Sequence, residues 1–95
     1  MIIGKRQSPL AAYVAHPAIK KYEGANLGVR EQAVLSQAVL HGGKAVFYDQ
    51  PGERIYYRAA LRLEEKGYGE ARPLGSRAVT IVLDESVLKR LRAII

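Results

Sequence analysis

Glycine and proline residues divide this chain into short segments, and that spacing limits what its 95 residues can form. The breaks fall at Pro9, at Pro17 and at residues 24–28, 42–43, 51–52, 67–69 and 73–75. Each segment suits one short helix or strand, and none approaches the roughly twenty apolar residues that a membrane helix needs. The length fits a single domain over residues 1–95 with one modest hydrophobic core.

The segment at 29–41 has the clearest helical pattern, because apolar residues recur on one face and Gly42 follows where a C-terminal cap belongs. The apolar positions are Val34, Leu35, Ala38 and Val39. Residues 9–22 are predicted to be helical in part, with a break or restart at the second proline. The aromatic and β-branched run Lys44–Tyr48 predicts a brief strand, and residues 50–52 predict a turn after it.

Residues 54–66 fit two patterns. At a period of two, apolar side chains alternate with arginines as in a hairpin strand. At a period of 3.6, the same residues form a helix with an apolar stripe opposite a basic row. The predicted stripe consists of Ile55, Tyr56, Ala59, Ala60 and Leu63. We favour the helix, because residues 59–66 are nearly all strong helix formers and Gly67 supplies a stop.

The C-terminal part predicts two strands and a helix. Residues 70–73 and 77–83 read as strands around a tight loop, and Asp84 then caps a helix that extends to about residue 94. The apolar face of this helix contains Val87, Leu88, Leu91 and Ile94 or Ile95. Together the segments predict an α+β fold, a small winged-helix-like domain of helices plus a two-stranded hairpin.

The balance of charge points to a polyanionic partner. Lys and Arg number 15 against nine Asp and Glu, so the chain carries a formal charge of +6. Such a surplus favours nucleic acid through counterion release, whereas the alternative is a merely basic, solvated surface. The chain has no cysteine, which excludes disulfides and Cys-ligated zinc and fits a cytoplasmic location. The arginine-rich C-terminal half and the absence of Trp suit a thermophile.

The residues that most often carry catalysis are not arranged for it. His16 and His41 lie far apart in the sequence, and neither has a nucleophile or acid at a recognised spacing. We expect one to pack at a helix start and the other near a helix end. The acidic pairs 64–65 and 84–85 point to different sides of a helix. The sequence therefore predicts no enzyme, no metal site and no cofactor.

A row of basic residues on the predicted helix is the strongest functional feature. It consists of Arg54, Arg58, Arg62 and Lys66, and the hairpin after it adds Arg72 and Arg77. Such a helix can lie along phosphates or enter a major groove, and a basic hairpin can reach a neighbouring groove. On this interpretation Arg58 and Arg62 can be replaced at little cost to folding. The alternative is a solvated helix stabilised by pairs such as Arg62 with Glu65.

The stretch LEEKGYGEARPLGSRAVTIVLDE, Leu63–Glu85, resembles the end of the recognition helix, the wing and the following strand of MarR-like winged helix-turn-helix regulators. The stretch REQAVLSQAVLHGG, Arg30–Gly43, resembles the helix that begins their DNA-binding unit. Between these two stretches the family has a further helix, where Lys44–Gly52 predicts only a strand and a turn. The resemblance implies a recognition helix with Arg54, Arg58 and Arg62, and a wing with Arg72 and Arg77.

Two other families share shorter stretches. The run IIGKR at Ile2–Arg6, together with Gly52–Ile55, resembles the Alba family of archaeal nucleic-acid-binding proteins. That resemblance implies Lys5, Arg6 and Arg54 as contacts and a chromatin or RNA-binding role. The run RAVTIVLDESVLKRL, Arg77–Leu91, is similar to the strand and first helix of ribbon-helix-helix repressors.

The sequence thus predicts a small basic nucleic-acid-binding protein, with DNA favoured over RNA, that regulates transcription. The alternatives are an Alba-like chromatin or RNA-binding protein and a ribosome- or protein-associated subunit. If the partner is single-stranded, the rings of Tyr48, Tyr56 and Tyr57 can stack on its bases, although such rings are also common in a core. A homodimer is predicted because the last helix ends in 93–95, Ala-Ile-Ile, and its apolar face exceeds what a small core covers.

Overall fold

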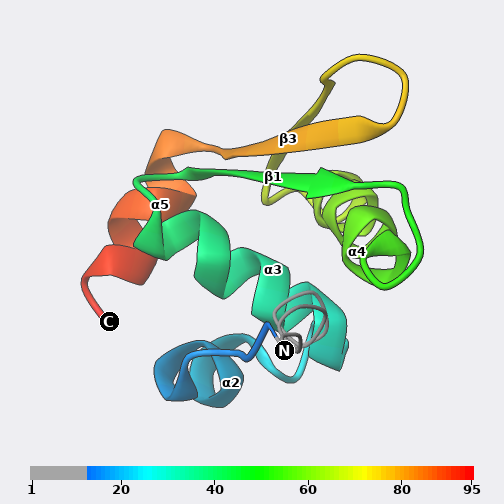
Figure 1. Cartoon of the computed structure of the whole chain (residues 1–95). Helices are drawn as coiled ribbons and strands as arrows, with labels where there is room; N and C mark the ends of the chain where they lie inside the picture. The colour runs from blue at the N-terminus through cyan, green and yellow to red at the C-terminus, as the bar shows by residue number, and fades with distance from the viewer. Residues whose placement is uncertain (1–12) are drawn as a thin grey trace, which may run out of the picture.

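The computed structural model describes residues 13–95, and these residues form an α+β domain, as predicted. The predicted contacts Lys5 and Arg6 lie outside the described residues. In chain order the elements are α2 (Pro17–Glu23), α3 (Val29–Leu40), β1 (Lys44–Tyr48), α4 (Arg54–Glu65), β2 (Gly69–Pro73), β3 (Ala78–Leu83) and α5 (Glu85–Arg92). Figure 1 shows α3, α4 and α5 on the same side of the strands, with α2 farther from them.

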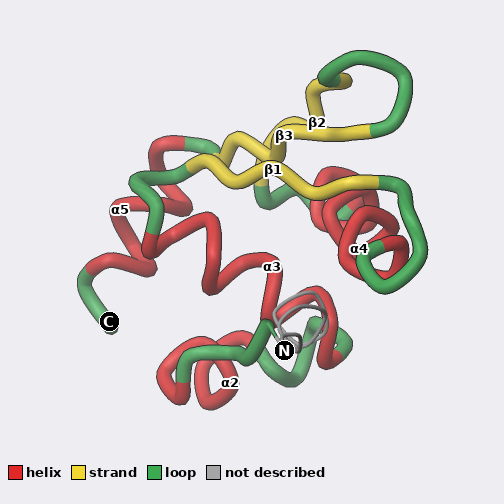
Figure 2. Tube along the Cα trace, in the orientation of Figure 1, coloured by secondary structure: helices red, strands yellow, loops and turns green. Residues whose placement is uncertain are grey.

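The sheet is larger than the sequence predicted. Its three antiparallel strands have the order β1-β3-β2, so the expected two-stranded hairpin, β2 and β3, is joined by β1 along the free side of β3 (Figure 2). The β1 pairing runs from Lys44 opposite Val82 to Tyr48 opposite Ala78. Strand β3 lies between the other two, so neither of its backbone edges is free, and its side chains at 79, 81 and 83 face the core. Between β1 and α4, residues 49–53 form turns in place of a helix.

Helices α3 and α4 cover the inner face of the sheet, and side chains of α2 and α5 complete the core. Helix α4 contacts all three strands, whereas α3 contacts β1 and β3. The largest completely buried apolar side chains are Phe47, Ile19, Leu35, Leu63, Ile81, Leu91 and Val34. They come from α2, α3, β1, α4, β3 and α5, so one core unites all of these elements.

The two core helices end in the same way. After α3, Gly42 has a φ of 77°, and the Gly43 N–H donates to the Ala38 carbonyl at 2.7 Å. After α4, Gly67 has a φ of 86°, and the Tyr68 N–H donates to the Leu63 carbonyl at 3.0 Å. A left-handed glycine followed by this backward hydrogen bond is a Schellman cap, so both predicted glycine stops are confirmed.

The buried stripe of α4 is confirmed except at its first member. Tyr56, Ala59, Ala60 and Leu63 are buried, but Ile55 is 45% exposed. Ile55 lies on the flank of α4 that looks toward the start of α3, beyond the edge of the core, where it lines a surface hollow. The helical spacing correctly predicted which face of α4 is buried. How many residues on that face are covered depends on the position of α3, which the spacing does not give.

Helix α5 packs its apolar face against its own chain. Leu91 is buried, and Val87, Leu88 and Ile94 are partly buried against the core. Leu88 also lies against Gly43, where an added Cβ would come within 2.8 Å of a Leu88 methyl carbon. The apolar area that suggested a dimer through this helix is therefore used mostly inside the domain.

Both histidines occupy the helix ends that the sequence predicted. The His16 side chain begins α2, where its Nδ1 accepts from the Ala18 N–H at 3.0 Å. The His41 Nδ1 lies 2.8 Å from the Gln37 carbonyl at the end of α3. Each ring serves as a helix cap.

Candidate nucleic-acid interface

The predicted basic row lies on α4, but its members do not share one environment. All four side chains are exposed, with Arg54 and Arg58 in the N-terminal half of the helix and Arg62 and Lys66 at its C-terminal end. The Arg54 Nε lies 2.7 Å from an oxygen of Asp49, and both side chains are more than 40% exposed. Arg58 has no ion-pair partner within residues 13–95, so its guanidinium is open to solvent.

The C-terminal half of the row, Arg62 and Lys66, forms ion pairs with α3. Glu31 of that helix is only 6% exposed, and its carboxylate meets both the Arg62 Nε and the Lys66 Nζ at 2.6 Å. The same carboxylate accepts from the Gly28 N–H at 3.1 Å, which completes a cap at the start of α3. The predicted pair of Arg62 with Glu65 is replaced by this contact with another helix, because Arg62 lies on the flank of α4 that faces α3.

The titration of Glu31 reflects these contacts. Burial on its own raises the pKa of this carboxyl, but hydrogen bonds from Lys66, Arg62 and the Gly28 N–H lower it below the ordinary value of 4.5. The carboxylate is therefore ionised at neutral pH and holds two cations of α4 in place. These two cations contribute to packing as well as to surface charge.

A second buried acid binds the C-terminal helix. Glu23 of α2 is 6% exposed in its side chain, forms an ion pair with Arg90 of α5, and accepts from the Tyr68 hydroxyl at 2.7 Å. Burial, with the hydrogen bond to Glu23, raises the pKa of Tyr68 to about 12. Arg90, like Arg62, thus forms an ion pair with a buried carboxylate.

One hollow on the surface brings together cations of two helices. It has a volume of about 380 Å³ and is lined by Ile55, Arg58 and Arg62 of α4 and by Arg30 of α3. Arg30 is exposed and has no ion-pair partner within the described residues. Arg30 was not predicted from the sequence, because it precedes the apolar stripe of α3 and no spacing links it to the row on α4.

The wing arginines lie in two different places. Arg77 follows the hairpin loop, and its carbonyl accepts from the Asp49 N–H at 2.7 Å, which places it beside the Arg54–Asp49 pair. Arg72 lies opposite Thr80 in β2, on the face of the sheet away from α4, and forms an exposed ion pair with Glu70. The structure thus joins Arg77 to the N-terminal end of the row and separates Arg72 from it.

The three tyrosines proposed for base stacking are also separated. Tyr48 is 45% exposed on the outer face of the sheet, whereas Tyr56 is buried in the core. Tyr57 is partly buried and packs against the same core. Only Tyr48 presents enough of its ring for stacking on a base.

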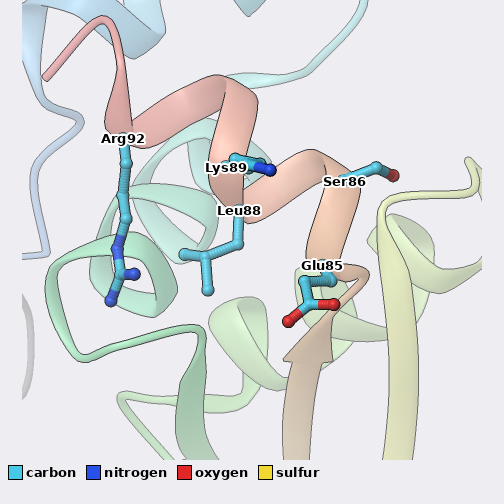
Figure 3. A pocket seen from close by; sticks show the side chains of 5 residues that line it. All are labelled: Glu85, Ser86, Leu88, Lys89 and Arg92. Atoms are coloured by element: carbon cyan, nitrogen blue, oxygen red, sulfur yellow. The ribbon is translucent and has the colours of Figure 1, made fainter.

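A further hollow, of about 570 Å³, lies along α5. Its lining residues are Glu85, Ser86, Leu88, Lys89 and Arg92. Figure 3 shows the Leu88 and Arg92 side chains extending to the same side of the helix, while Lys89 and Ser86 point elsewhere. All five residues come from one helix, so the hollow is a shallow depression beside α5.

The comparisons with known proteins return no relatives: no family model, no curated protein and no solved structure matches this chain. None of the helices described in residues 13–95 is long and apolar enough to cross a membrane. Over the same residues, no three His, Asp or Glu side chains gather where a metal ion could be held.

Proposed function

We propose that this protein is a non-catalytic nucleic-acid-binding protein of the cytoplasm that contacts duplex DNA through the N-terminal half of α4 and the adjoining start of α3. The observation that carries the proposal is the hollow between these helices, where Arg30 and Arg58 have no acidic partner within the described residues. Arginines that line a hollow suit phosphate groups, because two phosphate oxygens can accept parallel hydrogen bonds from one guanidinium.

Two features extend this surface. Arg54 and Arg77 flank Asp49 at the N-terminal end of α4, next to the hairpin loop. The helix and the loop can therefore contact phosphates on either side of one groove, as the arginine row and the hairpin suggested. The overall charge of +6 adds an attraction that depends on salt. A regulator of transcription and a chromatin component both fit such a surface.

A second candidate function is single-strand or RNA binding on the outer face of the sheet. The exposed ring of Tyr48 is the specific observation that favours it, with Lys44 on the same strand and Arg72 on the same face. Stacking on one aromatic ring contributes about 1–3 kcal/mol per base, and nearby cations supply the electrostatic part.

The test is a titration of the protein with duplex DNA, single-stranded DNA and RNA, each at two salt concentrations. The duplex proposal predicts tightest binding to duplex and a steep loss of affinity as salt rises. The double variant Arg30→Ala, Arg58→Ala is expected to reduce the salt slope by about two units, one for each phosphate contact. Arg62 is left in place, because its loss would disturb Glu31.

A matched control removes the same charge from the other end of the molecule. Lys89 and Arg92 are exposed on α5, which Figure 1 shows at the opposite end of the sheet from α4. Lys89→Ala with Arg92→Ala should reduce affinity only slightly. Equal losses from the two double variants would argue for diffuse attraction by net charge. Preference for single strands, abolished by Tyr48→Ala, would favour the outer face of the sheet.

A further inference from the structure

The two edge strands of the sheet, β1 and β2, differ in how many of their outward backbone groups have a partner. At the β2 edge, the outward N–H of Ala71 donates to the Glu64 carboxylate at 2.9 Å, and Pro73 has no N–H to offer. At the β1 edge, the structure shows a partner for one outward group in residues 13–95, the Tyr48 N–H, which lies 3.5 Å from the Glu53 carboxylate. Glu64 and Pro73 close one edge, whereas the other is left largely open.

The register identifies the open groups. The Gly43 carbonyl accepts from the Leu83 N–H, and the Asp49 N–H donates to the Arg77 carbonyl, so the odd-numbered residues of this segment pair with β3. The N–H and C=O groups of Lys44, Val46 and Tyr48 consequently point away from the sheet. A hollow of about 330 Å³ extends along this strand beside Tyr13, Gln37 and His41. Within the described residues, no strand or helix fills that side of β1.

We propose that β1 pairs with β1 of a second copy of this chain, antiparallel and about a twofold axis at Val46. In this register Val46 faces Val46 of the partner, and Lys44 faces Tyr48 of the partner on both sides. All three positions carry outward N–H and C=O groups, so the pairing forms up to about six backbone hydrogen bonds. Two three-stranded sheets become one sheet of six strands.

Side chains favour this partner over an unrelated peptide. Lysine on an edge strand usually discourages pairing, but a twofold axis at Val46 keeps Lys44 away from its symmetry mate. It places the ammonium opposite the Tyr48 ring, which is 45% exposed and attracts a cation through its π face. The β-branched Val46, 36% exposed in the single chain, becomes covered at the centre. The strand is thus complementary to itself.

The closed β2 edge determines the size of the assembly. Because Glu64 accepts from the Ala71 N–H and Pro73 has no N–H, the β2 edge of a dimer joined through β1 offers few donors to a third copy. Twofold pairing of this kind is closed, in contrast to the head-to-tail contacts that build filaments. The assembly is a dimer, and it does not use the apolar face of α5.

Sedimentation of the full chain tests the proposal directly. The parent is expected to be a dimer at about 50 μM, and Val46→Pro is expected to be a monomer with an unchanged circular dichroism spectrum. Proline at position 46 removes only an outward N–H, so it costs no hydrogen bond to β3, and edge strands tolerate it there. Val46→Thr keeps the N–H and should remain a dimer. A monomeric parent, or a folded Val46→Pro variant that is still a dimer, would overturn the proposal.

Cross-linking decides the matter even if the proline variant fails to fold. The chain has no cysteine, so Val46→Cys introduces a single thiol. Directly opposite residues in such a pair have Cα atoms about 5.5 Å apart, within the range that a disulfide spans. Mild oxidation should therefore give a covalent dimer. Thr80→Cys is the matched control, because Thr80 pairs with Val46 one strand farther inward, and two such thiols would lie about 14 Å apart. Equal cross-linking of both variants would contradict the proposed register.

Discussion

The two halves of α4 carry basic residues at the same spacing, yet they lie in opposite surroundings. In the N-terminal half, Arg54 meets an exposed acid and Arg58 meets none within the described residues. In the C-terminal half, Arg62 and Lys66 both contact Glu31, a buried carboxylate on another helix. Desolvation makes the loss of such a partner costly, whereas an exposed pair contributes little to stability.

This difference shows that the role of a cation is determined by the acid opposite it. The fourfold spacing places all four side chains along one side of α4, but Glu31 of α3 forms ion pairs only with the two at the C-terminal end, Arg62 and Lys66. There Glu31 binds two charges for packing and for the cap at Gly28. At the N-terminal end, Arg54 meets only the exposed Asp49, and Arg58 has no ion-pair partner within residues 13–95. A single row therefore combines a packing half, Arg62 and Lys66, with a half that we propose contacts nucleic acid, here called the binding half, Arg54 and Arg58.

The strongest test of this division is to remove each half in turn. Arg62→Ala with Lys66→Ala leaves Glu31 buried beside only the Gly28 N–H, so the free energy of unfolding should fall by about 3 kcal/mol. Arg54→Ala with Arg58→Ala should lower it by less than about 1 kcal/mol, since both side chains are exposed. Urea unfolding followed by circular dichroism measures both. Equal losses would mean that the two halves do not differ.

A smaller effect is expected from pH. The pKa of Glu31 in the folded chain lies below its ordinary value, so the ion pairs of Glu31 stabilise the folded chain fully at any pH above that ordinary pKa. This stabilisation is lost as the pH falls through the lower pKa that Glu31 has in the folded chain. Glu31→Gln lacks this contribution. The difference in unfolding free energy between parent and variant should be constant from pH 7 to about 5.5 and should shrink below about pH 4.5.

The control for the pH experiment is Glu65→Gln, because Glu65 is an exposed acid of α4 that forms no ion pair within residues 13–95. Its difference from the parent should stay nearly constant over the whole range. If the Glu31→Gln difference is also independent of pH between about 7 and 3, the two cations do not hold this carboxylate in its ionised form.

Much of the fold could be predicted because its cues are local. The helices at 29–40 and 54–65 follow from apolar spacing and from the glycines that end them, and β1 has the bounds that its aromatic run indicated. The pairing of β1 with β3 was not predicted, because the residues of a strand do not indicate which other strand it pairs with. Ile55 was placed in the core for a similar reason, since the width of a buried stripe depends on the neighbouring helix.

The site was harder to predict. The spacing identified the basic row, but Glu31 lies 31 residues before Arg62, and nothing in the sequence connects them. A comparably long separation in the sequence explains why Arg30 was not predicted, since only the fold brings it beside Arg58. Arg72 was expected beside the row, yet strand alternation turns it to the far face of the sheet. Replacing Arg62 is consequently not the harmless change that an exposed row suggested.

The smallest expected effect comes from Asp49, the exposed acid beside the binding half. Asp49→Asn keeps the shape of the side chain and the backbone N–H bond to Arg77, but it releases the charge of Arg54. The unfolding free energy should change by no more than about 0.5 kcal/mol, because exposed pairs are weak.

If the N-terminal half of α4 contacts phosphates, duplex affinity should rise by about two- to fivefold at low salt, and the salt slope should steepen by up to about one unit. Glu85→Gln makes the same charge change on α5 and should leave the slope unaltered. A salt slope that does not respond to Asp49→Asn would remove Arg54 from the interface and confine the binding half to Arg58 and its neighbour Arg30.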